Sequence, residues 1–234
     1  MKLNILYEDD FLLVCVKPAG VPSQGDKSNA VDMVTQVKNY IFDNQESDEE
    51  PYVALIHRLD RPVGGVMIFA KTPEAAANLT DQVMDGEMIK YYQAIVTGEL
   101  AEECGEMVDY MVKDSKTNMS RICKKGDKGA KKAVLSYELL DEIETDEGIL
   151  SYVLVELKTG RHHQIRLQMA SRGHGIWGDT KYNPLFTKTK NSYKQMALFS
   201  SRIELTHPDT NEHMVFKCEP EGEAFDIIEL DEFE

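Results

Sequence analysis

The sequence contains few cysteines, and they are not paired along the chain. Four occur among 234 residues, and no two of them form a C-x-x-C motif. They are Cys15, Cys104, Cys123 and Cys218. Disulfide bonds are therefore not expected to organise the fold, and a cysteine-based zinc site has no support.

Long apolar runs are also missing. No stretch approaches the roughly 20 apolar residues that would cross a bilayer, and the acidic residues 8–10 exclude a signal peptide. We therefore expect a cytoplasmic protein with no membrane partner. The chain also lacks internal repeats and linkers rich in glycine, serine or proline. We expect one domain over residues 1–234, with an acidic C-terminal tail, although two lobes sharing a sheet would also fit this length.

Positive charge is scarce overall but concentrated in one place. The net charge of −15 argues at first against a polyanionic partner. Residues 113–132, named here the basic segment, nevertheless hold eight basic residues against two acids. The eight are Lys113, Lys116, Arg121, Lys124, Lys125, Lys128, Lys131 and Lys132. Such separation permits a local nucleic-acid contact; a solvated lysine-rich hairpin is the alternative.

Apolar periodicity predicts many short strands and few helices. Two strands are expected within residues 5–16, and others at 53–56, 66–70, 91–96, 134–140, 150–157, 203–205 and 214–217. Helices are expected at 29–42 and 162–172, the second ended by Gly173. A third helix is predicted from Pro73, after an N-cap at Thr72, to Gly86, burying Ala76, Leu79 and Val83. This mixture predicts an α+β protein.

One carboxylate stands out within the run His57-Arg58-Leu59-Asp60-Arg61. Asp60 lies between two arginines, in a loop that continues through a proline and two glycines. Nearby positive charge favours the ionised form of a carboxylate, which suits a nucleophile better than a proton donor. The alternative is an aspartate that only pairs with arginine and caps a turn.

Four separated segments share an order and spacing with a known family. They are residues 5–21, residues 57–71 around the H-R-L-D run, residues 90–98 (KYYQAIVTG) and residues 159–166 (TGRHHQIR). Gly178, Asp179, Tyr182 and the pair His207-Pro208 follow in the same order. The set resembles the RluA family of pseudouridine synthases, which isomerise uridine in RNA, over about residues 5–225. We expect a short form of this family, without the small basic RNA-binding module that many relatives carry before the segment that begins at Ile5.

The resemblance implies a fold, an activity and catalytic residues. It implies an α+β catalytic domain with a central mixed, mostly antiparallel sheet, flanking helices and an active-site cleft. Asp60 would be the nucleophile, Arg166 its ion-pair partner, and Tyr92 the ring against a flipped base. Arg58 would fill the space that this base leaves, and His57 would orient its neighbours. No metal or other cofactor is implied.

The resemblance also implies an RNA partner, with a stem-loop of rRNA or tRNA as the expected substrate. The residues expected to contact RNA are His57, Arg58, Arg61, Lys17, Arg161, His163, Lys124, Lys125, Lys128 and Lys131. Lys17 serves equally well as a cation at the edge of a turn. The chain departs from the family at Val63-Gly64, where Thr-Ser is frequent, and at Gln168, where histidine is frequent.

Two other functions remain open from the sequence. A non-catalytic RNA-binding protein on the same fold would not need Asp60, Tyr92 and Arg166, so their presence argues against it. A glycoside-cleaving enzyme would share only the carboxylate chemistry, and most such enzymes use two carboxylates rather than one.

Overall fold

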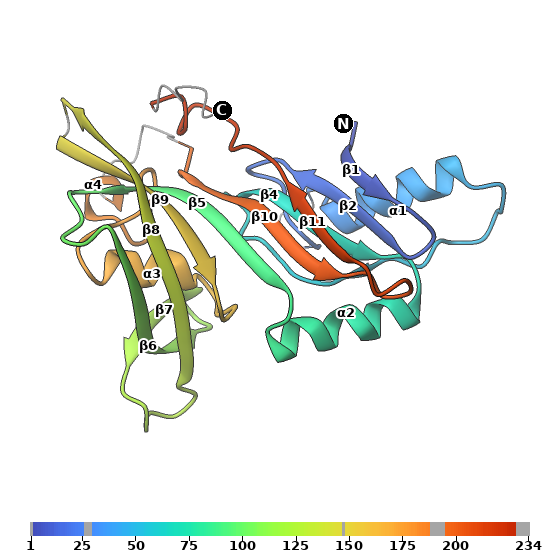
Figure 1. The fold of residues 1–234 in the computed structure, drawn as a ribbon, viewed down its shortest axis with the longest axis horizontal. Helices are drawn as coiled ribbons and strands as arrows, with labels where there is room; N and C mark the ends of the chain where they lie inside the picture. Colours follow the sequence, from blue (N-terminus) through green and yellow to red (C-terminus); the bar gives the residue numbers. More distant parts are fainter. Residues whose placement is uncertain (1, 26–29, 147, 188–194, 228–234) are drawn as a thin grey trace. The chain divides into compact units, whose positions relative to one another are not determined.

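The chain forms two compact units in a computed structural model that describes residues 2–25, 30–146, 148–187 and 195–227 (Figure 1). Unit 1 comprises Met1–Lys90 and Ser200–Glu219, and unit 2 comprises Tyr91–Phe199 and Pro220–Glu234. The expectation of a single domain over the whole chain stays a prediction, and part of the acidic tail lies outside the described residues. Within the described part of the chain, no helix has the length and apolar character needed to span a membrane.

Unit 1 is built on a sheet in which the pairings of β1 with β2, β2 with β4, β3 with β4 and β10 with β11 are antiparallel. Its strands run in the order β1-β2-β4-β10, with β3 also on β4 and β11 also on β10. They are β1 (Asn4–Glu8), β2 (Leu12–Lys17), β3 (Ala54–Leu55), β4 (Gly64–Ala70), β10 (Leu198–Thr206, of which the first two residues belong to unit 2) and β11 (His213–Lys217). The strands predicted for these regions are confirmed.

Two helices lie in the described residues of unit 1. Helix α2 (Pro73–Asp85) begins after Thr72, whose side chain accepts a hydrogen bond from the Ala75 N–H, and ends at Gly86 in the left-handed conformation. Its Ala75 and Leu79 are buried in the core formed with β2, β4, β10 and β11. The predicted bounds of α2 are therefore confirmed. Helix α1 (Met33–Asn44) begins later than predicted because Asp32 is its N-cap.

Unit 2 is built on an antiparallel sheet in the order β5-β9-β8-β6-β7. Its strands are β5 (Ile89–Thr97, of which the first two residues belong to unit 1), β6 (Cys104–Asp114), β7 (Met119–Cys123), β8 (Lys131–Thr145) and β9 (Gly148–Leu157). The short helices α3 (Gln164–Ala170) and α4 (Pro184–Thr187) follow. Strands β6 and β7 were not predicted, but the α+β class with a mostly antiparallel sheet is confirmed.

Helix α3 is shorter than the predicted range 162–172. It begins at Gln164 because His163 has a left-handed backbone, with φ of +55°, and forms its N-cap. It ends at Ala170, and Gly173 takes a positive φ three residues later. His163 and Arg166, at the start of this helix, are both buried.

Candidate active site

Asp60 lies in a turn between β3 and β4 whose backbone is held from two sides. The Val63 N–H donates to the Asp60 carbonyl at 2.9 Å, and the Asp60 side chain is partly exposed. The preceding residue, Leu59, is bound through both backbone groups by one hydroxyl. Ser23 Oγ donates to the Leu59 carbonyl at 2.8 Å and accepts from the Leu59 N–H at 3.1 Å. The carboxylate therefore extends from a fixed backbone.

Lys17 binds the backbone of this turn after Asp60, at the Arg61 carbonyl. Its side chain is fully buried, and Nζ donates to the carbonyls of Pro18, Val21 and Arg61 at 3.0, 2.6 and 3.1 Å. Burial lowers the pKa of Lys17 to about 7, while the negative charge of Asp60 acts in the opposite direction. The predicted RNA contact of Lys17 is therefore wrong, because its amino group is used inside the turn.

The two arginines beside Asp60 are exposed. Arg61 Nε donates to the Gly20 carbonyl at 2.9 Å, and the Gly20 N–H donates back to the Arg61 carbonyl at 2.8 Å. Arg61 thus joins the Asp60 turn to the turn after β2. The RNA contacts predicted for Arg58 and Arg61 stay predictions, and their exposure is compatible with them.

His57 carries a neutral ring. Its Nε2 accepts a hydrogen bond from the Ile68 N–H at 3.2 Å, which assigns the proton to Nδ1. Nδ1 is buried and has no hydrogen-bond partner in the part of the chain that the structure describes. Burial, followed by the positive charge of Lys90, lowers the pKa of His57 to about 3. The geometry favours the orienting role and contradicts a charged contact with RNA at neutral pH.

We predict that Ser23→Ala lowers the free energy of unfolding by about 2 kcal/mol, because both backbone groups of Leu59 lose a buried partner. Turnover should fall several-fold, since the backbone before Asp60 is released. Urea denaturation and a turnover assay measure the two effects. The control is Ser47→Ala, an exposed serine that should change neither. Unchanged stability in Ser23→Ala would show that the hydroxyl does not hold the turn.

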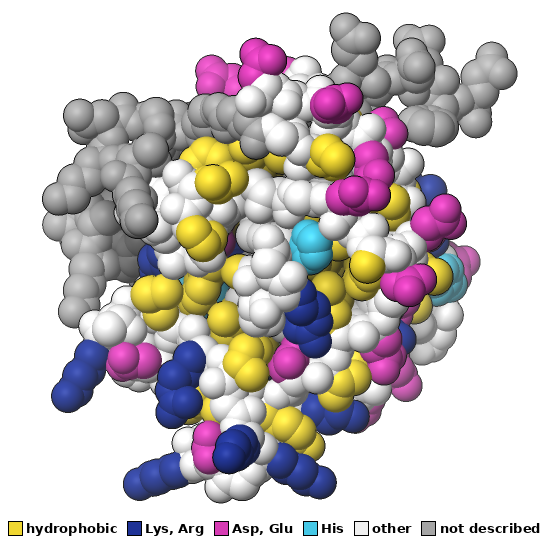
Figure 2. Space-filling model, turned by 90° about the vertical axis from the view of Figure 1, so that its left-hand side faces the viewer, with side chains coloured by type: hydrophobic (Ala, Val, Ile, Leu, Met, Phe, Trp, Pro, Cys, Tyr) yellow, Lys and Arg dark blue, Asp and Glu magenta, His cyan; other side chains and the backbone are white. Residues whose placement is uncertain are grey.

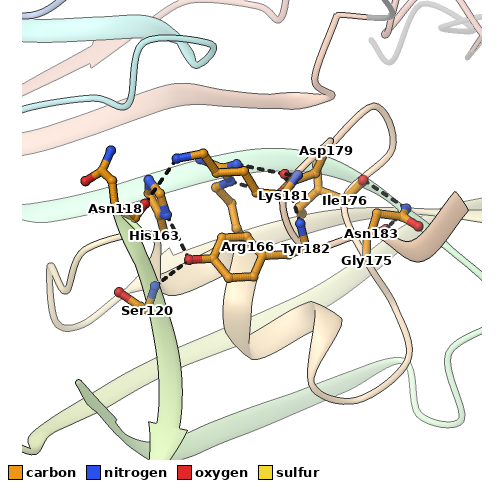
Figure 3. Close-up of polar contacts among 10 residues, drawn as sticks. All are labelled: Asn118, Ser120, His163, Arg166, Gly175, Ile176, Asp179, Lys181, Tyr182 and Asn183. Atoms are coloured by element: carbon orange, nitrogen blue, oxygen red, sulfur yellow. Dashed lines mark hydrogen bonds and ion pairs between the residues drawn. The ribbon is translucent and has the colours of Figure 1, made fainter. Parts of the chain in front are cut away.

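Arg166 lies on α3 and is fixed by a buried carboxylate (Figure 3). Its Nε and Nη2 donate to the two oxygens of Asp179 at 2.8 and 2.7 Å, and the two residues are 4% and 1% exposed. Asp179 Oδ1 also accepts from the N–H groups of Lys181 and Tyr182 at 2.8 and 3.3 Å. This two-point contact sets the plane of the guanidinium. The predicted ion pair of Arg166 with Asp60 stays a prediction.

Tyr182 completes the surroundings of Arg166. Its ring centroid lies 5.3 Å from Arg166 Cζ, within the range of a cation–π contact. Its hydroxyl accepts from the Ser120 N–H at 2.7 Å and bonds to His163 Nδ1 at 2.9 Å (Figure 3). His163 is 7% exposed, and its predicted RNA contact stays a prediction. It serves to join the start of α3 to Tyr182 and β7.

Tyr92 and Gln168 are both buried in unit 2. Tyr92 is 6% exposed on β5 and pairs with Val155 on β9. Its role against a flipped base stays a prediction. Gln168, which replaces a frequent histidine, is fully buried and donates to Asp109 Oδ2 at 2.7 Å and to the Met107 carbonyl at 3.2 Å. Gln168 therefore connects α3 to β6 through these two hydrogen bonds.

The basic segment forms the end of β6, the strand β7, a loop and the start of β8. Asp127 organises the loop, because its Oδ2 accepts from the Lys124 N–H at 3.0 Å and its N–H donates to the Lys124 carbonyl at 3.0 Å. Lysine and arginine side chains gather at the lower end of the view in Figure 2. The four lysines of the basic segment that are predicted to contact RNA are all exposed: Lys124, Lys125, Lys128 and Lys131. Arg161 is also exposed, and its Nε donates to the Lys132 carbonyl at 2.9 Å.

Ser23 was missed by the sequence analysis, and Asp179 and Tyr182 appeared there only as parts of the resemblance. Ser23 lies 36 residues before its partner Leu59, and no local pattern marks it. The acid of the Gly178-Asp179 pair was a signal for a partner of Arg166, because a buried arginine needs a carboxylate. Their contacts give them the positioning roles described above.

Comparisons with known proteins agree on one family. The RNA pseudouridylate synthase family matches residues 11–171. The chain is 32% identical to tRNA pseudouridine synthase C of Vibrio parahaemolyticus, over 93% of this chain and 90% of that protein. It is 28% identical to ribosomal large subunit pseudouridine synthase D of Buchnera aphidicola, over 97% of this chain and 72% of that protein.

A solved structure supports the fold. Human RNA pseudouridylate synthase domain containing 4 matches with a TM-score of 0.75 and 22% identity, covering 92% of this chain and 88% of that one. The resemblance predicted from the motifs is confirmed by the family match and by the relatives. The chain therefore belongs to the RluA family of RNA pseudouridylate synthases and is an isomerase that makes pseudouridine.

Proposed function

We propose that this protein modifies a uridine in a stem-loop of tRNA, with Asp60 as the nucleophile. The observation that carries the assignment of Asp60 is the fixed turn. Lys17 and Ser23 are both buried, and their side chains hydrogen-bond to the backbone of the turn that carries Asp60. The Asp60 carboxylate is partly exposed. A cytoplasmic location is part of the proposal, because it is where such RNA is made and matured in cells without a nucleus.

The proposed reaction is an isomerisation in which every atom of the base is kept except one proton. The bond between N1 of uracil and C1′ of ribose breaks, the base turns, and a bond forms between C5 and C1′. The proton on C5 is released, and N1 gains one. Asp60 bonds covalently to the base or to the sugar carbon in the intermediate, and this bond breaks again as the product forms. Either route uses the same carboxylate.

The other residues divide the remaining tasks. Arg166, held in one plane by Asp179, would direct the Asp60 carboxylate and keep it ionised. Tyr92 would support the flipped base. Arg58, exposed beside Asp60, would enter the stack and offset part of the few kcal/mol that base flipping requires.

The choice of tRNA rests on the relatives. The one at 32% identity is named for tRNA, and the one named for ribosomal RNA is less similar, at 28%. Bases in a hairpin loop are already partly unstacked, which lowers the free energy required for flipping. A uridine in such a loop is the substrate that this chain fits best, and a ribosomal stem-loop is the alternative.

The test uses RNA labelled with tritium at C5 of uridine, purified as separate tRNA and rRNA fractions from cells that lack the gene. Release of tritium into water reports the loss of the C5 proton. We expect release from tRNA, up to about one equivalent per molecule for each modified position. Release from rRNA alone would replace the proposed substrate, and binding without release would mean that the chain is a non-catalytic RNA-binding protein.

The basic segment is expected to supply phosphate contacts. Replacing Lys124, Lys125, Lys128 and Lys131 together by glutamine should weaken RNA binding and reduce the slope of log Kd against log salt by about 3, since up to four counterions are no longer released. Binding measured at several salt concentrations gives the slope. The matched control replaces four lysines elsewhere, the exposed Lys2, Lys158 and Lys217 and the partly exposed Lys38. A slope equal to that of the wild type would make the segment a solvated loop.

A further inference from the structure

Strands β6, β7 and β8 form a sheet with one covered face. Side chains alternate between the two faces along each strand. Met111 on β6 and Ala133 on β8 are buried on one face, where they pack against Leu167 of α3. The residues directly before and after Met111 and Ala133 in the sequence therefore have their side chains on the opposite face. Val108 on that face is 46% exposed, so the opposite face is open.

Tyr110 lies in the middle of the open face and is partly exposed. The strand register places it opposite Cys123 on β7 and Lys132 on β8. Val112, the next residue on this face of β6, pairs with Arg121, which puts Arg121 diagonally beside Tyr110. Arg121 and Lys132 are both exposed. An aromatic ring thus stands between two basic side chains on an open sheet.

The part of this face near β7 holds more basic than acidic side chains, with Asp114 as an acid beside Arg121. A Cβ added to Gly129 would lie 3.5 Å from Val112 Cγ2, so the lysine-bearing loop between β7 and β8 comes back against the same sheet. Glu106, further along β6, is paired with Lys158 at 3.2 Å. In a chain with a net charge of −15, this local excess of positive charge is complementary to a polyanion.

We propose that Tyr110, Arg121 and Lys132 form a platform for an unpaired nucleotide of the substrate RNA. The base stacks on the Tyr110 ring, and Arg121 and Lys132 contact the phosphates on either side. Aromatic side chains on an open sheet bind single-stranded bases in this way, and stacking accepts any base. This inference rests on the proposed function, because it takes RNA as the ligand, and it adds a contact beyond the catalytic residues.

Substitutions of Tyr110 separate stacking from charge. The probe is a tRNA pool from cells lacking the gene, and binding is measured at several salt concentrations. Tyr110→Ala should weaken binding about 5- to 50-fold at every salt concentration without changing the salt slope. Tyr110→Phe should bind within twofold of the wild type, and Tyr110→Leu should resemble alanine. Replacing Arg121 and Lys132 by glutamine should instead reduce the slope by about 1.5.

Val108→Ala is the matched control, because it removes exposed apolar surface from the same face and should bind within twofold of the wild type. Photocrosslinking of wild-type protein to tRNA transcripts containing 4-thiouridine needs no variant, and should join RNA to the peptide that contains Tyr110. Crosslinks confined to other peptides would overturn the platform. So would full affinity in Tyr110→Ala, or full affinity in Tyr110→Leu.

Tritium release distinguishes a failure of the platform from a failure of the proposed function. Tyr110→Ala should raise KM for tRNA by the same factor as Kd and leave kcat within twofold of the wild type. Wild-type kcat and KM in this variant would overturn the platform while the enzyme function stands. If wild-type protein binds tRNA through Tyr110 but releases no tritium, the platform stands and the proposed function fails.

Discussion

Asp60→Asn is expected to reduce turnover to less than about a thousandth of the wild-type rate, a loss of more than about 4 kcal/mol of transition-state stabilisation. The amide has nearly the shape of the carboxylate but is not a nucleophile. The fold should not change, because Lys17 and Ser23 hold the turn through hydrogen bonds to its backbone carbonyls. Tritium release measures the rate, and urea denaturation measures the stability.

A matched variant makes the result for Asp60 specific. Asp43→Asn removes one negative charge from an exposed position on α1 and should leave turnover unchanged. RNA affinity should also be retained in Asp60→Asn, because binding precedes the chemistry. Residual turnover above about a thousandth in a pure, stable preparation would remove the nucleophile assignment from Asp60.

Arg166→Leu is expected to slow turnover by a factor of about 100 or more. The guanidinium is the group that we assign to directing Asp60, and leucine offers no donor. The same substitution leaves Asp179 buried without its cation, which costs about 3–5 kcal/mol of stability when one member of a buried pair is removed. Slow turnover of the single variant therefore has two possible causes.

The double variant Arg166→Leu/Asp179→Asn separates these causes. Removing the charge of Asp179 should recover much of the stability, because no unpaired ion remains buried. Turnover should stay low, since the group that directs Asp60 is still missing. Recovery of turnover in the double variant would reduce Arg166 to a purely structural role. Arg172→Leu, which breaks an ion pair of Asp109 near the same helix, is the control and should retain turnover.

Elements set by local chemistry were predicted correctly. Thr72, Pro73 and Gly86 each act on the backbone next to them, so α2 was found with its bounds. Strands β6 and β7 were missed because their alternation depends on a helix far along the chain. Met111 is buried in a cluster that includes Leu167 of α3, 56 residues later in the sequence.

The same distinction explains the outcome for the site. The Asp60 loop and the segment that carries Arg166 were located correctly, because the motifs of a family can be recognised from the types and spacing of their residues. Burial is not visible there. Lys17 was expected to contact RNA, but its buried amino group donates to three backbone carbonyls. One of these belongs to Arg61, which lies 44 residues later in the sequence, so the contact could not be predicted from local pattern. The left-handed backbone of His163 and the bond from its ring to the Tyr182 hydroxyl were also not visible in the sequence.

The most direct test of the central claim is to map pseudouridines in tRNA from cells lacking the gene, complemented with either the wild-type protein or Asp60→Asn at equal abundance. We predict at least one tRNA position that is pseudouridine with the wild-type protein and uridine with Asp60→Asn. The same position modified by both proteins would contradict the account, because the isomerisation would then proceed without this carboxylate.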